Sequence, residues 1–211
     1  MFKHIIFSFF ALSALSALTP QDSLQKLIDG NHRFMKHLVT HPDQTVERRR
    51  KTADLQEPFA IILGCSDSRV SPEIVFDQGI GDLFVVRVAG NVVSPVVLDS
   101  IDYSAIHLHS SIILVMGHEN CGAVSAVLKG VEQDIPAIAS FIKPAVEESK
   151  AQYGNRMENA VKDNVQNAVR LIKVSPPIAK LIAEKKIDVV GGYYNFCTGK
   201  VDIFPAEKSI K

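Results

Sequence analysis

The sequence of 211 residues has no tryptophan, three cysteines and no excess of either charge, with 23 basic and 23 acidic residues. Three cysteines are too few and too scattered for a small scaffold held by disulfides, and their odd number leaves at least one thiol unpaired. Balanced charge gives no electrostatic reason to expect nucleic acid or an anionic membrane as a partner. Because 46% of the residues are hydrophobic, the composition excludes a disordered chain.

The sequence also lacks an apolar run long enough to cross a membrane. The first one, from Ile5 to Leu18, has roughly 14 residues, whereas a spanning helix needs about 20. It follows Lys3 and ends in small residues, which is typical of a secretory signal peptide. We therefore predict a signal peptide over residues 1–18, cleaved after Ser16 or Ala17, and a periplasmic or secreted mature protein. An uncleaved anchor and a buried N-terminal helix are the alternatives.

Four short apolar runs without polar alternation predict strands that are covered on both faces, as in a parallel sheet. The runs are residues 59–64, 83–88, 112–116 and 187–190. Helical patterns separate them, and the first helix is predicted to start at Thr19-Pro20, a capping hydroxyl before a first-turn proline. Residues 193–204 are expected to add an edge hairpin that turns at Thr198–Lys200. The alternation predicts a single α/β domain over residues 19–211, with a mostly parallel β-sheet of four to five strands flanked by helices.

Side chains that bind metals follow two of these strands, at the carboxyl ends where such sheets bind ligands. Cys65 comes directly after the first run, and His118 and Cys121 follow the third run as a His-x-x-Cys motif. Zinc prefers thiolate and imidazole ligands, and three protein ligands leave its fourth position open for water, as in catalytic sites. The pattern predicts one catalytic Zn²⁺ per chain.

Asp67 and Arg69 lie two and four residues after Cys65, in the same loop. A carboxylate placed there either accepts a hydrogen bond from the water on the metal or moves onto the metal and blocks it. The guanidinium of Arg69 favours the first role, because its planar fork clamps a carboxylate through two hydrogen bonds. We predict that Asp67 and Arg69 are the catalytic pair.

Each of these residues also has an ordinary interpretation. Cys65 suits a small buried apolar position, His118 a satisfied core histidine, and Asp67 with Arg69 a loop salt bridge. A His-x-x-Cys motif alone is weak evidence for a metal site. The combination of both motifs, each at a strand end, favours the metal site.

The two motifs resemble those of the β-class carbonic anhydrases. They are Cys65-Ser66-Asp67-Ser68-Arg69-Val70 and Gly117-His118-Glu119-Asn120-Cys121-Gly122. In that family, Cys-x-Asp-x-Arg and His-x-x-Cys supply the zinc ligands and the Asp–Arg pair. The resemblance extends over residues 22–205, and residues 84–91 are similar to the family's Phe-Val-x-Arg-Asn-x-Ala-Asn stretch, with departures at Val88 and Gly90.

The resemblance implies a substrate pocket as well. Gln56, Phe84 and Tyr103 match the pocket residues of plant-type members, and Gly122 in the second motif is assigned to the same pocket. An apolar slot with one amide donor suits CO2, which is small, linear and apolar. For Phe84 and Tyr103 the alternative is ordinary core packing.

The absence of tryptophan indicates which subgroup of the family the chain resembles. Some members of the family are inhibited by bicarbonate at a second site that uses a tryptophan three residues before the first cysteine. Here Ile62 occupies that position. The chain therefore resembles the plant-type subgroup, in which water rather than Asp67 completes the zinc coordination.

The implied function is zinc-dependent, reversible hydration of CO2 to bicarbonate and a proton. The resemblance also implies a homodimer or homotetramer, and the substrates CO2 and bicarbonate are the expected small-molecule partners. One alternative is a carbonyl sulfide or carbon disulfide hydrolase on the same scaffold. The other is a zinc-buffering or thiol-redox protein, which would give Asp67 and Arg69 no role and lacks a Cys-x-x-Cys pair. Cys197 lies in the expected edge hairpin and is predicted not to bind the metal.

Overall fold

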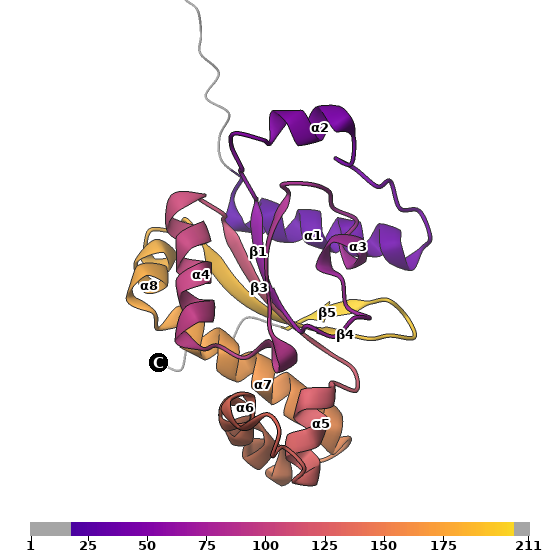
Figure 1. The fold of residues 1–211 in the computed structure, drawn as a ribbon, viewed down its shortest axis with the longest axis vertical. Helices are drawn as coiled ribbons and strands as arrows, with labels where there is room; N and C mark the ends of the chain where they lie inside the picture. The colour runs from indigo at the N-terminus through magenta and orange to yellow at the C-terminus, as the bar shows by residue number, and fades with distance from the viewer. Residues whose placement is uncertain (1–17, 205–211) are drawn as a thin grey trace, which may run out of the picture.

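The computed structural model describes residues 18–204 (Figure 1). The predicted signal peptide, apart from Leu18, lies outside the described residues. Among the helices that are described, none combines the length and the apolar character needed to cross a membrane.

The described chain alternates strands and helices. The strands are β1 (Ala60–Gly64), β2 (Leu83–Arg87), β3 (Ile112–His118), β4 (Asp188–Tyr194) and β5 (Val201–Ile203). The helices are α1 (Pro20–Met35), α2 (Val46–Lys51), α3 (Pro72–Val75), α4 (Pro95–His107), α5 (Gly122–Lys129), α6 (Pro136–Glu148), α7 (Arg156–Lys173) and α8 (Pro176–Ala183), with short 3₁₀ turns η1 (Ala89–Asn91) and η2 (Ser149–Ala151). The helix predicted to start at Thr19 does so, because the Thr19 hydroxyl accepts the N–H of Asp22 and Pro20 is the first helical residue.

The strands form one sheet in the order β2-β1-β3-β4-β5. The first four strands are parallel, and β5 pairs antiparallel with β4. This arrangement confirms the predicted fold class, including the edge hairpin. Because β1 and β3 are neighbours, the two motif loops leave the sheet side by side.

Helices cover both faces of the sheet, as the strands without polar alternation predicted (Figure 1). On one face α4, α7 and α8 pack against side chains that include Ile61 and Ile113. On the other face α1 and α3 pack against side chains that include Ile62 and Leu114. A third apolar cluster, contributed largely by α5, α6 and α7, encloses Cys65 and Cys121 beyond the carboxyl ends of the strands.

The fourth strand is longer than predicted. The apolar run ended at Val190, but β4 continues through Gly191 to Tyr194 and supplies the first arm of the hairpin. Gly191 interrupts the apolar pattern for a packing reason. A Cβ on this residue would lie 2.8 Å from side-chain atoms of both Val165 and Phe204, so only glycine lets α7 and the chain after β5 approach the strand this closely.

Candidate metal centre

Parallel pairing of β1 with β3 brings the three predicted ligands together. Gly64, the last residue of β1, pairs with Met116, two residues before β3 ends at His118. Cys65, His118 and Cys121 are buried, with exposed fractions of 4%, 0% and 1%. Their ligand atoms all lie within 4.8 Å of one another.

The contacts of His118 leave its Nε2 atom available to bind a cation. Its Nδ1 lies 2.9 Å from the carbonyl oxygen of Glu119, and because a carbonyl only accepts, Nδ1 carries the proton. In the neutral tautomer with that proton, Nε2 keeps its lone pair, and this buried atom has no hydrogen-bond partner among the described residues. Leaving such a group unpaired costs about 1–3 kcal/mol. A neutral imidazole fixed through its other nitrogen is the usual state of a metal-binding histidine.

The two thiols complete a donor set that fits Zn²⁺. The contact with the Cys121 thiol lowers the pKa of Cys65 more than burial raises it, and the N–H of Gly90 lowers that pKa further. The same contact, together with burial, raises the pKa of Cys121. Without a cation, the two cysteines therefore favour a state with one thiolate and one thiol over a state with two thiolates. A divalent cation removes that limit, because a thiol that coordinates a metal ion loses its proton.

Backbone groups from beyond β2 surround Cys65. The N–H of Gly90 donates to its Sγ at 3.3 Å, and Asn164 of α7 donates to the Gly90 carbonyl at 2.8 Å. Gly90 has a φ of 72°, and a Cβ there would lie 2.8 Å from Ile142, so the position requires glycine. Arg87 donates to the Cys65 carbonyl at 2.9 Å. These contacts fix the direction of the Cys65 side chain.

Asp67 and Arg69 form the predicted clamp. Nε and Nη2 of Arg69 donate to the two carboxylate oxygens at 2.9 and 2.7 Å, and the Arg69 backbone N–H adds a bond of 3.0 Å. The Arg69 side chain is the main reason why the pKa of Asp67 lies well below its usual range. Oδ2 of Asp67 is 3.9 Å from Nε2 of His118. The carboxylate therefore adjoins the ligand cluster while it is bound to Arg69.

Glu119 and Phe196 line the same site, although neither was predicted to have a role there. The Phe196 ring lies 4.3 Å from Cζ of Arg69 and 5.4 Å from the ring of His118. The Glu119 carboxylate accepts the backbone N–H of Phe196 at 3.1 Å. Phe196 is far from both motifs in the sequence, and only the pairing of β3 with β4 brings it here, so no local signal could have identified it.

The structure does not bring Gln56, Phe84 and Tyr103 to the metal loops of their own chain. Gln56 precedes β1, Phe84 pairs with Ile61 near the start of that strand, and Cys65 follows its end. Tyr103 packs beside Phe84, with ring centroids 6.2 Å apart, and is 48% exposed. Gly122, by contrast, directly follows Cys121 as the first residue of α5. The pocket assignment of these residues stays a prediction. Cys197 is exposed and lies outside the three-ligand cluster.

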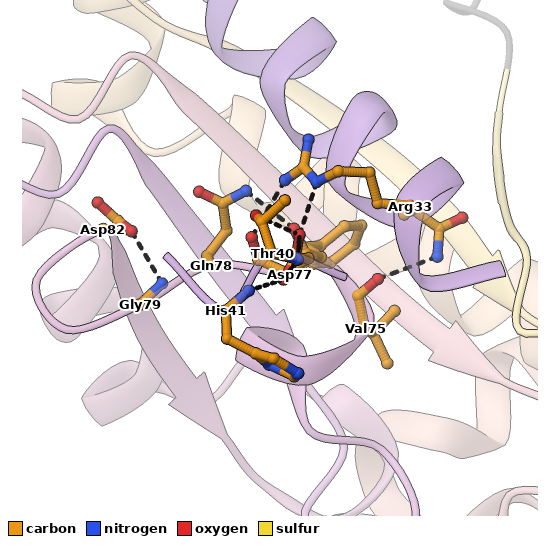
Figure 2. Close-up of polar contacts among 10 residues, drawn as sticks. Arg33, Thr40, His41, Val75, Asp77, Gln78, Gly79 and Asp82 are labelled. Carbon is orange, nitrogen blue, oxygen red and sulfur yellow. Dashed lines mark hydrogen bonds and ion pairs between the residues drawn. The ribbon is translucent and has the colours of Figure 1, made fainter. Parts of the chain in front are cut away.

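A buried aspartate, Asp77, lies just after α3 (Figure 2). Its carboxylate accepts Nε of Arg33 at 2.6 Å, the N–H and hydroxyl of Thr40 at 3.0 Å each, and the N–H of His41 at 2.9 Å. These donors come from α1 and the loop that follows it. The carboxylate therefore attaches that loop to the chain between α3 and β2.

Comparisons with known proteins agree on one family. The family model described as carbonic anhydrase matches residues 60–201, which contain both motif loops. A protein of Mycolicibacterium smegmatis named carbonic anhydrase is 36% identical over 191 residues, which cover 87% of this chain and 93% of the relative. Carbonic anhydrase 2 of Mycobacterium tuberculosis is 35% identical over 188 residues, with coverages of 86% and 91%.

Solved structures show the same fold. The β-carbonic anhydrase CcaA has a TM-score of 0.69 at 23% identity, with 86% of this chain and 95% of that chain covered. A Coccomyxa β-carbonic anhydrase in complex with acetazolamide has a TM-score of 0.67 at 28% identity, and 85% of each chain is covered. One of two tetrameric β-carbonic anhydrases from Sordaria macrospora has a TM-score of 0.67 at 22% identity, with coverages of 87% and 98%.

Proposed function

This chain belongs to the β-class carbonic anhydrase family, and we propose that it hydrates CO2 reversibly to bicarbonate and a proton at a zinc site made by Cys65, His118 and Cys121. The enzyme class follows from the family and from relatives that match over most of the chain. One observation carries the zinc site. Among residues 18–204 the buried Nε2 of His118 has no hydrogen-bond partner, and the ligand atoms of His118 and the two cysteines lie within 4.8 Å of one another.

Zn²⁺ bound there would acidify a water molecule and so supply a nucleophile near neutral pH; carbonic anhydrase is itself the standard example of this chemistry. Asp67 accepts a hydrogen bond from the reacting water, which fixes the lone pair that faces CO2. Arg69 holds Asp67 in place for this role. The Asp67 side chain is 17% exposed and that of Arg69 is 55% exposed, so the pair lies between the buried ligands and solvent. Substrate and proton exchange on this side.

The pairing of Asp67 with Arg69 supports the plant-type subgroup. With both carboxylate oxygens bound to the guanidinium, Asp67 is held away from the role of a fourth ligand. Asp67 would then leave the fourth position of a zinc ion held by the three ligands to water. The absence of tryptophan at Ile62 supports the same proposal.

We propose that Gln56, Phe84 and Tyr103 complete the substrate pocket of a second copy of the chain. They lie far along the strands from their own metal loops, and Tyr103 is about half exposed. Phe84 belongs to β2, an edge strand of the sheet, and β1 is the only one of the described strands that pairs with it. A homodimer or homotetramer would cover this edge. Gly122 serves the pocket of its own chain.

Export is a further part of the proposal. Residues 1–18 are taken as a signal peptide, and the enzyme would act in the periplasm or outside the cell. Mass spectrometry of the protein purified from the periplasmic fraction would give the new N-terminus.

Hydrolysis of carbonyl sulfide or carbon disulfide on the same scaffold is the rival activity. The named relatives are carbonic anhydrases, which does not favour it. A comparison of the rates with CO2 and with both sulfur compounds would separate the activities.

The decisive experiment is stopped-flow CO2 hydration on purified protein whose zinc content is measured. We expect one zinc per chain and a rate far above the uncatalysed one. Cys65→Ser, His118→Ala and Cys121→Ser should each remove both zinc and activity. Full zinc in the Cys65→Ser protein would contradict the ligand assignment, and zinc-loaded wild type without CO2 hydration would contradict the function.

A further inference from the structure

Arg69 holds one side-chain orientation although the side chain is largely exposed. Its side chain is 55% exposed, yet its guanidinium must stay in one orientation to bind both oxygens of Asp67. A long arginine side chain in solvent has many rotamers, and exposed ion pairs are weak because holding two such side chains in one geometry loses entropy. Some other group has to restrict Arg69.

Phe196 is that group in the structure. Its ring centroid lies 4.3 Å from Cζ of Arg69, within the range of a cation–π contact. The ring removes solvent from one face of the guanidinium. It therefore stabilises the positive charge and blocks the rotamers that would swing the guanidinium through that space.

The ring is itself fixed on several sides. The carboxylate of Glu119 accepts the backbone N–H of Phe196 and the side-chain amide of Asn195, both at 3.1 Å. Tyr194 meets the Phe196 ring edge-on at 5.5 Å, and His118 lies 5.4 Å away. Glu119 directly follows His118, so the loop after β4 is attached to the metal loop itself.

We propose that Phe196 is a positioning residue of this enzyme: its ring keeps the guanidinium of Arg69 in the orientation that clamps Asp67, and Glu119 keeps the ring in place. The proposal rests on the proposed function, in which Asp67 orients the reacting water. Phe196 does not touch the substrate, and its effect on the reaction passes through Arg69.

Three variants of the zinc-loaded enzyme test the role of the ring. Phe196→Leu keeps an apolar side chain of similar size but has no π system, whereas Phe196→Tyr keeps the ring. We expect kcat/KM for CO2 to fall about twofold to fivefold in Phe196→Leu and to stay near wild type in Phe196→Tyr, with zinc content unchanged in both. Phe34→Leu is the matched control, because Phe34 packs near Gly199 of the same loop and has no contact with Arg69 among those described.

A double variant separates positioning from general support of the site. In an Arg69→Gln background the ring has no guanidinium to hold, so adding Phe196→Leu should change kcat/KM by less than about 1.5-fold. A further fall as large as in the wild-type background would show that Phe196 acts through another contact, such as His118, and would overturn the proposal.

A spectroscopic readout does not depend on turnover. In the zinc-loaded protein, the Arg69 Nε–H should exchange with solvent several times faster in Phe196→Leu than in wild type or Phe196→Tyr, because its bond to Asp67 opens more often. Unchanged exchange together with unchanged kcat/KM in Phe196→Leu would overturn the proposal. Those results would leave the proposed function intact, since only an inactive zinc-loaded wild type contradicts that.

Discussion

Asp67 and Asp77 are two carboxylates that each pair with an arginine and each have a lowered pKa, yet their surroundings differ. Asp77 is 1% exposed in its side chain and is bonded by Arg33, Thr40 and His41, from a distant part of the chain. The described donors to the Asp67 carboxylate all belong to Arg69, two residues away. Asp77 joins two segments of the chain, whereas Asp67 adjoins Nε2 of His118, which has no hydrogen-bond partner in the part of the chain that the structure describes.

The comparison shows that a lowered pKa marks a paired carboxylate and not a catalytic one. What distinguishes Asp67 is its capacity to accept another hydrogen bond. Each carboxylate oxygen accepts about two bonds, and the four donors around Asp77 fill that capacity. Asp67 is 17% exposed in its side chain, and its three described donors leave part of the carboxylate's capacity open. We therefore expect changes at Asp67 to alter rate and changes at Asp77 to alter stability.

The largest effect is expected for Asp67→Asn. The amide is nearly isosteric but presents N–H groups where the reacting water needs an acceptor. The kcat/KM for CO2 should fall by about 10²- to 10³-fold, while zinc content stays at one per chain. Stopped-flow assays paired with metal analysis measure both. Activity close to wild type at pH 8 would show that the Asp67–Arg69 pair is only structural.

Asp77→Asn should have the opposite profile. An amide cannot accept all of the donors that Asp77 binds, so the Arg33 charge and backbone N–H groups lose partners in a buried place. The free energy of unfolding in urea should fall by about 3 kcal/mol. The kcat/KM of the protein that stays folded should remain within about twofold of wild type. If Asp77→Asn instead removed activity without loss of stability, the contrast between the two aspartates would be wrong.

Acid should weaken the fold through Asp77. Donors from Arg33, Thr40 and His41 outweigh burial and lower its pKa to about 2, whereas an unfolded aspartate titrates near 3.9. A folded pKa below the unfolded one gives stability that is present above about pH 4 and is lost as the pH falls toward 2. Urea unfolding at several pH values should show about 1–3 kcal/mol of this loss in wild type. The same acid-dependent portion should be missing from Asp77→Asn.

The smallest effect is expected at Cys197, which takes part neither in the contacts described for Asp67 nor in those described for Asp77. The thiol is exposed in the turn between β4 and β5. Cys197→Ser should leave zinc content, kcat/KM and the free energy of unfolding unchanged within about 0.5 kcal/mol. A clear loss of zinc would assign this thiol to the metal site and would contradict the prediction that Cys197 does not bind the metal.

The sequence predicted those parts that depend on local pattern. Apolar runs locate strands because both faces are covered, and the loops after β1 and β3 carry Cys65 and His118 at the sheet edge where ligands bind. The extent of β4 was missed because the glycines at its centre are there for packing. Such a requirement depends on α7 and cannot be seen in the strand itself.

Contacts between distant segments could not be predicted. Nothing near Asp77 indicates that Thr40 and His41 will donate to it, and nothing near Arg69 indicates Phe196. The direction of Gln56 and Tyr103 relative to the metal loops likewise depends on strand order and register. Motif matching identifies which residues a family uses but not which of them lie together in one chain.

The parallel pairing of β1 with β3 has a consequence for how the protein folds. About fifty residues separate Cys65 from His118, and α3, β2 and α4 lie between them, so this pairing closes a long loop and is intrinsically slow. The ligands meet only once the sheet has formed. A zinc ion cannot nucleate such a fold as it does in a small zinc finger, where the ligands are close in sequence. We expect the chain to acquire its sheet without metal and to take up zinc afterwards.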